Sequence, residues 1–220
     1  GYSSAASDVY KRQKSDFVRF LHSLFDGDSV ARTVEAYRLG CTRKGAVIYW
    51  QVDLNGEVRT GKIMRYDPVT GKRVKDGRSI TWAHSELKRQ GLLPESWELS
   101  QCLFGEHLLR LRPSDTVCLV EGEKSAVIGT IVMPEYVWLA TGGKQNLKPE
   151  KCRCLIGRRV IVFPDLGAFN LWSEKASVLA GAGVSVEVSD LLERVADDAD
   201  RSEGLDIADY IIRQFNNDRL

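Results

Sequence analysis

The chain has 220 residues, 43% of them hydrophobic and 28% charged, and its formal net charge is +1. This composition is ordinary for a globular protein, and the length allows one large domain or two small ones. No apolar run approaches the roughly 20 residues of a membrane span, and nothing near the N-terminus resembles a signal peptide. We therefore expect a cytoplasmic protein without a membrane partner.

The first part of the chain differs from the rest. Residues 1–14 have no sustained periodicity and few core-forming side chains, so we expect a non-native or disordered tail there, with the natural protein beginning upstream. An apolar stripe then indicates a helix over residues 16–25 with Asp16 as its N-cap, and a second helix follows up to Tyr37. Helical structure is therefore expected to open the folded region.

An antiparallel segment follows these helices. Residues 46–52 are β-branched and aromatic, residues 53–56 have turn chemistry, and residues 57–66 are predicted to return as the second strand of a hairpin. Residues 81–91 are again helical in pattern. Together with the first helices, these elements predict a small α+β subdomain over residues 15–112.

Positive charge is concentrated in this subdomain. Between Arg59 and Arg78 there are seven basic residues and two acids, whereas between Glu187 and Asp209 there are nine acids and two arginines. A basic surface of this kind suits a polyanionic partner, although a solvated face would have the same composition. Aromatic residues are interleaved with the basic ones, and they are expected either to stack on single-stranded nucleic acid or to belong to the core; they are Tyr49, Trp50, Tyr66 and Trp82.

The last part of the chain, residues 113–220, contains short apolar runs without polar alternation. This pattern is typical of strands that are buried on both faces of a parallel sheet. The predicted strands are residues 116–120, 136–140, 159–163 and 183–188, and the predicted crossover helices are residues 123–131, 147–156 and 168–180. The alternation predicts an α/β fold with an open, doubly wound parallel sheet. Residues 191–203 are expected to be an acidic loop.

Acidic residues follow three of these predicted strands. Glu121 comes directly after the first strand, and Asp165 comes two residues after the third. Ligands of open α/β sheets bind beyond the carboxyl ends of the strands, so the two carboxylates are expected to converge there if their strands are neighbours. Hard oxygen ligands with open coordination positions suit Mg²⁺ or Mn²⁺. Asp190 ends the fourth strand and lies at the same edge if that strand is parallel.

Three sequence motifs resemble the toprim domain of bacterial-type DNA primases and topoisomerases. They are Val120-Glu121-Gly122, the turn at Ala140-Thr141-Gly142-Gly143, and Phe163-Pro164-Asp165-Leu166-Gly167. In that family a glutamate closes the first strand and a DxD motif closes a later one, and these acids bind Mg²⁺ for phosphoryl transfer. Glu121 matches the glutamate and Asp165 the first aspartate, but Gly167 stands where the second aspartate is expected. The similarity extends to primase-like proteins of bacterial mobile elements and covers residues 115–190.

This resemblance implies roles for several residues. Glu121 and Asp165 would be catalytic and would bind the metal ion together with Asp190, while Glu123 and Asp206 would support the site. Asp206 would otherwise cap the last helix. The residues that would contact nucleic acid or phosphate are Lys124, Gly142, Gly143, Lys144, Arg59, Lys62, Arg65, Lys72 and Arg73.

The function that this resemblance implies is Mg²⁺-dependent nucleotidyl transfer on DNA in the replication of a mobile element. Single-stranded DNA and nucleotides would be the partners, together with a replicative helicase. Two alternatives stay open from the sequence. Because Gly167 carries no carboxylate, the chain could be a non-catalytic nucleic-acid-binding module, and because toprim sheets also occur in nucleases, it could be a metal-dependent nuclease.

Overall fold

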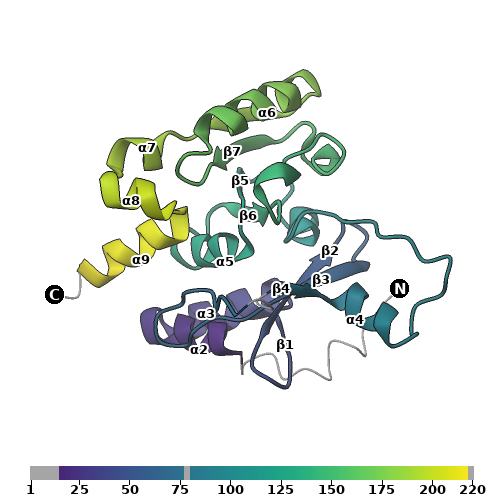
Figure 1. The fold of residues 1–220 in the computed structure, drawn as a ribbon. Coiled ribbons are helices and arrows are strands. Elements are labelled where there is room, and N and C mark those ends of the chain that lie inside the picture. The colour runs from purple at the N-terminus through teal and green to yellow at the C-terminus, as the bar shows by residue number, and fades with distance from the viewer. Residues whose placement is uncertain (1–14, 77–79, 218–220) are drawn as a thin grey trace. The chain divides into compact units, whose positions relative to one another are not determined.

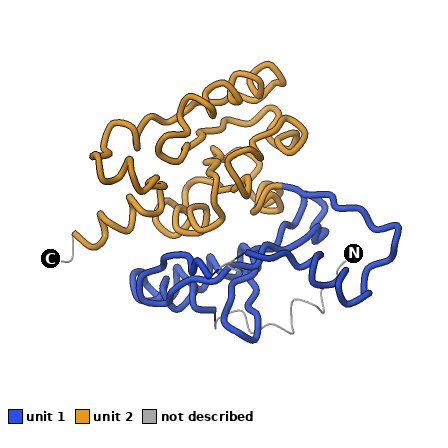
Figure 2. Tube along the Cα trace, in the orientation of Figure 1, with its two compact units in different colours: residues 1–102 blue, residues 103–220 orange. Residues whose placement is uncertain are grey.

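The computed structural model describes residues 15–76 and 80–217, so the expectation for residues 1–14 lies outside the described residues. The chain divides into two compact units, residues 1–102 and residues 103–220 (Figure 2). The sequence had placed this division near residue 112. Among the helices of the described residues, none combines the length and the apolar character needed to cross a bilayer.

The first unit begins with two helices, α2 (Asp16–Leu24) and α3 (Gly27–Ala36) (Figure 1). The predicted N-cap at Asp16 is wrong by one position, because Ser15 Oγ accepts a hydrogen bond from the backbone amide of Val18. The side chain of Asp26 caps α3 in the same way. The apolar face of α2, which includes Phe17 and Phe20, is buried, and this burial stabilises the helix more than its intrinsic propensity does.

An antiparallel sheet completes the first unit. It has the order β1-β2-β3-β4 and consists of β1 (Gly40–Cys41), β2 (Val47–Val52), β3 (Val58–Met64) and β4 (Ile80–Trp82). The predicted hairpin is confirmed, with Tyr49 opposite Lys62 in the register. Residues 81–91 divide between β4 and helix α4 (Ala83–Arg89), so the observed helix begins two residues later than predicted.

The aromatic residues of this sheet form its core. The ring of Phe17 lies 5.9 Å from that of Tyr49 and 4.9 Å from that of Tyr66, measured between centroids. Tyr49, Tyr66 and Trp50 are all buried, so of the two roles that the sequence left open, the core role is confirmed for these three. Trp82 is only half-buried.

The second unit contains the predicted parallel sheet, and the predicted fold class is confirmed. Its strand order is β6-β5-β7-β8, with all neighbouring pairs parallel. The strands are β5 (Val117–Val120), β6 (Val137–Ala140), β7 (Arg159–Phe163) and β8 (Ser185–Val188). Because β5 and β6 are buried along their whole length, they carry the continuous apolar runs by which the sequence revealed them.

Helices connect these strands and lie on both sides of the sheet (Figure 1). The longer ones are α5 (Glu123–Val132), α6 (Phe169–Gly181) and α9 (Ile207–Asn217), and α5 packs against α9. Two short helices, α7 (Leu191–Val195) and α8 (Asp198–Glu203), replace the acidic loop that the sequence predicted. The side chains of Asp197 and Asp200 form a reciprocal capping box at the start of α8, which explains why so acidic a segment is helical.

The predicted helix over residues 147–156 is wrong. That connection consists of turns and two 3₁₀ helices, η2 (Lys144–Asn146) and η3 (Arg153–Leu155). Lys175 of α6 donates to the carbonyl groups of Gln145 and Leu147, so a side chain satisfies backbone acceptors that a helix would have satisfied internally. A further 3₁₀ helix, η1 (Glu106–Arg110), precedes β5.

Candidate metal centre

Strand pairing places Glu121 and Asp165 at the same edge of the parallel sheet. Strands β5 and β7 are direct neighbours, and Val120 pairs with Phe163 in their register. Glu121 follows Val120 directly, and Asp165 lies two residues beyond Phe163. Both side chains are half-buried.

Asp206 reaches this edge from a distant part of the sequence. The backbone amide of Leu166 donates to the carbonyl oxygen of Leu205 at 2.9 Å. This hydrogen bond joins the residue after Asp165 to the residue before Asp206 and so brings the two acids together. Asp206 stands immediately before α9, and its Oδ1 accepts a hydrogen bond from the amide of Asp209 at 2.8 Å. The predicted capping geometry is therefore present, and the same carboxylate also faces Asp165.

The electrostatics of Asp165 show how crowded these carboxylates are. Burial, the negative charges of Asp206, Glu121 and Asp209, and a side-chain hydrogen bond with Glu121 together raise the pKa of Asp165 to about 9. The neutral acid is favoured because each of these neighbours penalises a further negative charge. We refer to Glu121, Asp165, Asp206 and Asp209 as the acidic cluster. Sequence reasoning missed Asp209, although its spacing of three residues from Asp206 is typical of a helix N-terminus.

One lysine lies against the acidic cluster. The Nζ atom of Lys124, in the first turn of α5, is 2.8 Å from Asp209 Oδ1 and 3.7 Å from Asp206 Oδ2. Its side chain retains only 15% of its surface exposed. Burial raises the pKa of Asp206, while the attraction of Lys124 opposes that rise. Lys124, which is predicted to contact phosphate, contacts two carboxylates in this structure.

The donor set fits a hard divalent cation. The carboxylates of the acidic cluster outnumber the one lysine beside them, and burial together with the neighbouring negative charges raises the pKa of Asp165. Within residues 15–76 and 80–217, no three His, Cys, Asp or Glu side chains are arranged to ligate one ion. Mg²⁺ commonly uses one or two carboxylates and completes its shell with water and phosphate oxygens. The pair Glu121 and Asp165 meets that requirement.

The backbone conformation at Gly167 disfavours an aspartate at this position. Gly167 has a φ of +80°, a conformation that side-chain-bearing residues rarely adopt. Its amide donates to Glu193 Oε1 at 3.1 Å, and Arg201 holds the other oxygen of Glu193 at 2.8 Å. Arg201 and the Gly167 amide lower the pKa of Glu193. A carboxylate therefore does stand beside Gly167, but it is already paired.

Two other predicted acids lie in different surroundings. Asp190 follows β8, the neighbour of β7, so it is at the same edge of the sheet. It is exposed, and its Oδ1 lies 3.0 Å from Arg194 Nε. Glu123 is buried in the first turn of α5.

The glycine turn after β6 is tied to the end of β5. The amide of Gly142 donates to the carbonyl oxygen of Glu121 at 2.9 Å, while Gly143 N lies 3.5 Å from Thr141 Oγ1. The amide of Gly142 is thus already occupied, which reduces the ability of this turn to bind the phosphate that Gly142 and Gly143 were expected to contact. Lys144 begins η2 and is exposed. Lys151, which the sequence did not single out, donates to the carbonyl oxygen of Thr141 at 3.4 Å.

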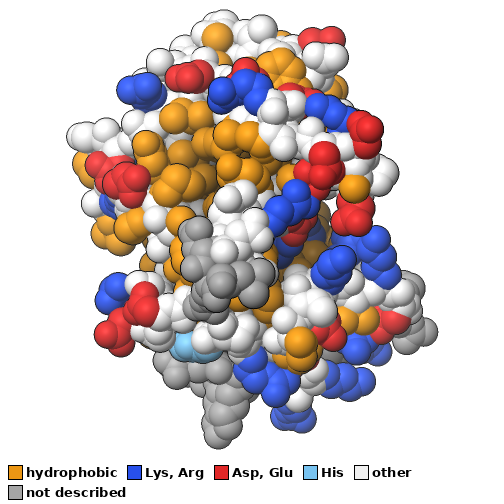
Figure 3. Space-filling model, turned by 90° about the vertical axis from the view of Figure 1, so that its left-hand side faces the viewer, with side chains coloured by type: hydrophobic (Ala, Val, Ile, Leu, Met, Phe, Trp, Pro, Cys, Tyr) orange, Lys and Arg blue, Asp and Glu red, His pale blue; other side chains and the backbone are white. Residues whose placement is uncertain are grey.

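The predicted phosphate-binding residues of the first unit fall into two groups. Three of them are already engaged or covered. Arg59 binds Asp53 through Nε at 2.7 Å, Arg65 is paired with Asp76, and Lys62 is buried. The other two, Lys72 and Arg73, are exposed. In the face drawn in Figure 3, Lys and Arg side chains gather in the lower right of the view with few acidic side chains among them.

Comparison with solved structures identifies the fold as that of primase catalytic cores. The DnaG catalytic core aligns with a TM-score of 0.56 and 12% identity, over 96% of this chain and 81% of that one. The RNA polymerase domain of Mycobacterium tuberculosis primase DnaG gives 0.51 and 16%, over 96% and 80%. A DnaG primase catalytic domain bound to single-stranded DNA gives 0.51 and 11%, over 96% and 82%. At these identities the likeness establishes the fold.

The sequence family is also shown. The chain belongs to the family described as domain of unknown function DUF6371, whose model matches residues 15–166. A comparison with curated proteins gives no match. The matched region ends one residue after Asp165, so it includes Glu121 and Asp165 but not Asp206 or Asp209.

Proposed function

We propose that this chain is a primase-like protein that carries out Mg²⁺-dependent nucleotidyl transfer on a DNA template, in the replication of a mobile element. One observation carries the proposal: Glu121 and Asp165 follow adjacent parallel strands, and the surrounding negative charge raises the pKa of Asp165 to about 9. Such perturbed carboxylates cluster at functional sites. Mn²⁺ would satisfy the same oxygen ligands.

In this proposal Glu121 and Asp165 hold the ion. A bound Mg²⁺ would orient the phosphates of the nucleotide and neutralise charge that develops during transfer. The proton shared between Asp165 and Glu121 would leave when the ion binds, because metal ligands must be deprotonated. Asp206 and Asp209 would add negative charge around the site, and Lys124 would balance part of that charge.

Nucleic acid and nucleotides are the proposed partners. The exposed Lys72 and Arg73 of the first unit and the exposed Lys144 of the second unit are the predicted cations best placed to contact phosphate. The solved DnaG domains include one bound to single-stranded DNA and one in complex with double-stranded DNA. A replicative helicase is proposed as a further partner because primase action is coupled to strand opening.

A non-catalytic nucleic-acid-binding module is the second candidate. It is favoured by Gly167, where the motif has an aspartate and this backbone has a φ of +80°. Losing one carboxylate weakens a metal site that has few protein ligands from the start. Metal binding and polymer synthesis therefore have to be measured separately.

The test is a calorimetric titration with Mg²⁺ of the wild type, Glu121→Gln and Asp165→Asn, combined with a primer-synthesis assay on single-stranded DNA. Both substitutions preserve shape and remove a carboxyl group that could ligate the ion. Glu35→Gln, which neutralises an exposed acid of the first unit, is the matched control. We expect Mg²⁺ binding to be lost in both site variants and retained in the control, and synthesis to follow the same pattern.

The outcomes separate the candidates. Mg²⁺ binding without synthesis would favour the binding module, and degradation of the template in place of primer synthesis would identify a nuclease. If the two site variants bind Mg²⁺ as the wild type does, the metal centre is not at Glu121 and Asp165.

A further inference from the structure

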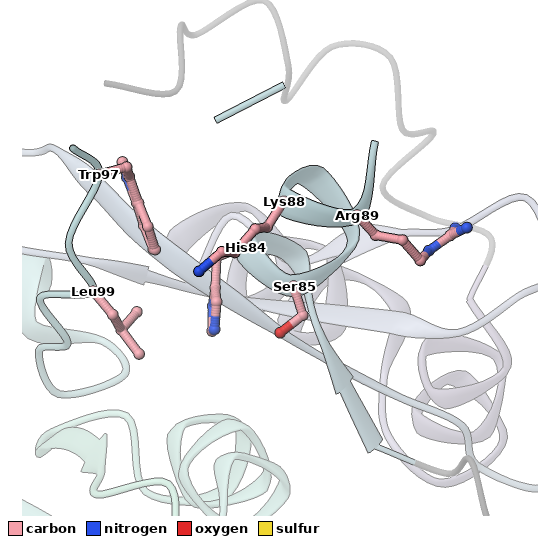
Figure 4. Close-up of a pocket in the computed structure, with 6 residues that line it drawn as sticks. All are labelled: His84, Ser85, Lys88, Arg89, Trp97 and Leu99. Carbon is pink, nitrogen blue, oxygen red and sulfur yellow. The ribbon is translucent and has the colours of Figure 1, made fainter. Parts of the chain in front are cut away.

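A second candidate site lies within the first unit, on helix α4 and the segment that follows it. An open cavity of about 490 Å³ is lined by His84, Ser85, Lys88, Arg89, Trp97 and Leu99. Figure 4 shows Trp97 and Leu99 on one side of it and His84 and Ser85 on the other, while Arg89 points away from Trp97. His84 and Lys88 are four residues apart and therefore share one face of α4.

The imidazole of His84 is fixed in orientation. Its Nδ1 lies 2.7 Å from Thr60 Oγ1 on β3, and its ring contacts the indole of Trp82 with centroids 5.7 Å apart. Burial and the nearby charge of Lys88 lower the pKa of His84, so the ring is neutral at neutral pH. The cavity therefore presents a flat, uncharged ring next to the ammonium group of Lys88.

Trp97 lies nearly parallel to this imidazole. The two ring centroids are 5.6 Å apart and the planes are inclined by 23°. A third ring between them would need a gap of about 7 Å, twice the optimal carbon–carbon separation, so it cannot insert there. Trp97 is only half-buried and Leu99 is 46% exposed, so part of each side chain is accessible from solvent. This arrangement is a platform on which a planar group can stack.

The charges around the platform suit a singly charged anion. The guanidinium of Arg89 is 2.8 Å from Glu86 Oε2, so its charge is balanced locally. Lys88 is exposed and is the other described cation that lines the cavity. One ammonium group matches the single charge of a phosphodiester, whereas a free nucleoside triphosphate carries several charges and would be poorly compensated here.

We propose that this cavity is a stacking site for a nucleotide of single-stranded DNA, with the base on Trp97 and the adjoining phosphodiester at Lys88. Aromatic platforms combined with basic side chains are the common means of holding single strands without reading their sequence. The residues that the sequence suggested for stacking, Tyr49, Trp50 and Tyr66, are in the core, so they leave this role open. The inference agrees with the proposed function but requires neither a metal ion nor catalysis.

The experiment measures binding of fluorescently labelled oligo(dT) to the full chain by anisotropy, in EDTA and over a range of salt concentrations. Alanine substitution of a stacking aromatic typically weakens binding several-fold to about a hundredfold, so we expect Trp97→Ala to weaken it about tenfold. Trp97→Phe should retain most of the affinity. Leu92→Ala, which removes an exposed apolar side chain of the same segment outside the cavity, is the matched control and should have no effect.

The phosphate contact has its own readout. Lys88→Ala should reduce the dependence of log K on log salt by about 0.7, the value for one phosphate of a single strand. Lys44→Ala, an exposed lysine of the same unit outside the cavity, should leave the slope unchanged. Because Lys88 is exposed, its loss tests the site without disturbing the core.

Several results would overturn the proposal. One is equal affinity for oligo(dT) in the wild type and Trp97→Ala. Another is that the wild type binds free dTTP more tightly than oligo(dT) and that Trp97→Ala loses only dTTP binding. That result would identify the cavity as a site for free nucleotides. Oligo(dT) binding is measured in EDTA and Mg²⁺ binding by calorimetry, so failure of the stacking site and failure of the metal centre are distinguishable.

Discussion

The ammonium group of Lys124 lies 2.8 Å from Asp209 Oδ1 and thereby joins the first turn of α5 to the first turn of α9. The same lysine reaches Asp206, whose carboxylate raises the pKa of Asp165. Asp206 therefore connects the ion pair at Lys124 with the raised pKa of Asp165.

Replacing Lys124 should make the fold depend on the metal ion. In Lys124→Ala, Asp206 and Asp209 lose their counter-charge, and leaving such groups uncompensated typically costs about 1–3 kcal/mol. We expect the Tm in EDTA to fall by several degrees, and saturating Mg²⁺ to restore more stability in the variant than it adds to the wild type. Lys124→Arg is the control and should resemble the wild type. Equal losses of Tm with and without Mg²⁺ would mean that Lys124 acts only through packing.

The raised pKa of Asp165 predicts an unusual pH dependence of stability. The unfolded carboxyl titrates near 3.8 and the folded one at about 9, so between these values the folded state binds more protons than the unfolded state. Stability in EDTA should therefore decrease as pH rises through this window, by at most about 1.4 kcal/mol per pH unit for one proton. Asp206, whose pKa is also raised, acts in the same direction.

Urea unfolding at pH 5 and pH 8 measures this effect. Asp165→Asn should lose less stability between the two values than the wild type, because the amide cannot ionise. Asp190→Asn, at an exposed site, should lose as much as the wild type. Saturating Mg²⁺ should flatten the wild-type dependence, since the ion favours the ionised carboxylate. A wild-type dependence in EDTA that Asp165→Asn leaves intact would assign the effect to another group.

Helix α5 packs closely against β6 at Gly129. A Cβ atom at Gly129 would lie 2.6 Å from Cε2 of Trp138, whose ring stacks on Phe163 at a centroid distance of 5.5 Å. Gly129→Ala should therefore destabilise the protein by about 1–3 kcal/mol through overpacking. Gly181→Ala, at the end of α6 with no atom within 4 Å of the added group, should be neutral or slightly stabilising. Urea unfolding of the two variants gives the comparison.

The parallel sheet could be predicted from sequence because its strands are buried along their length. The runs at Val117–Val120 and Val137–Ala140 have no polar alternation. Glu121 follows the first run directly, and the glycine turn at Gly142 closes the second. The placement of Glu121 beside Asp165 follows from strand adjacency alone. These features depend on local pattern and on general rules of α/β topology.

Other features depend on contacts that local pattern does not contain. Asp206 reaches Asp165 through the hydrogen bond between Leu166 and Leu205, which no periodicity indicates. The connection from β6 to β7 appeared helical in sequence, but Lys175 of α6 satisfies its carbonyl groups from outside. Trp97 lies in an irregular segment, and its relation to His84 exists only in the folded unit.

Gly167→Asp tests whether the missing carboxylate is what limits the metal centre. A Cβ atom at this position has no neighbour within 4 Å, so there is room for the side chain, but a φ of +80° imposes a cost of about 1–2 kcal/mol on any residue other than glycine. Asp tolerates this conformation better than most residues.

Gly167→Asn carries the same backbone cost without the charge and is the matched control. We expect both variants to lose a similar amount of Tm in EDTA, and only Gly167→Asp to bind Mg²⁺ more tightly than the wild type by calorimetry. If the two variants bind Mg²⁺ equally, a carboxylate at this position does not reach the ion.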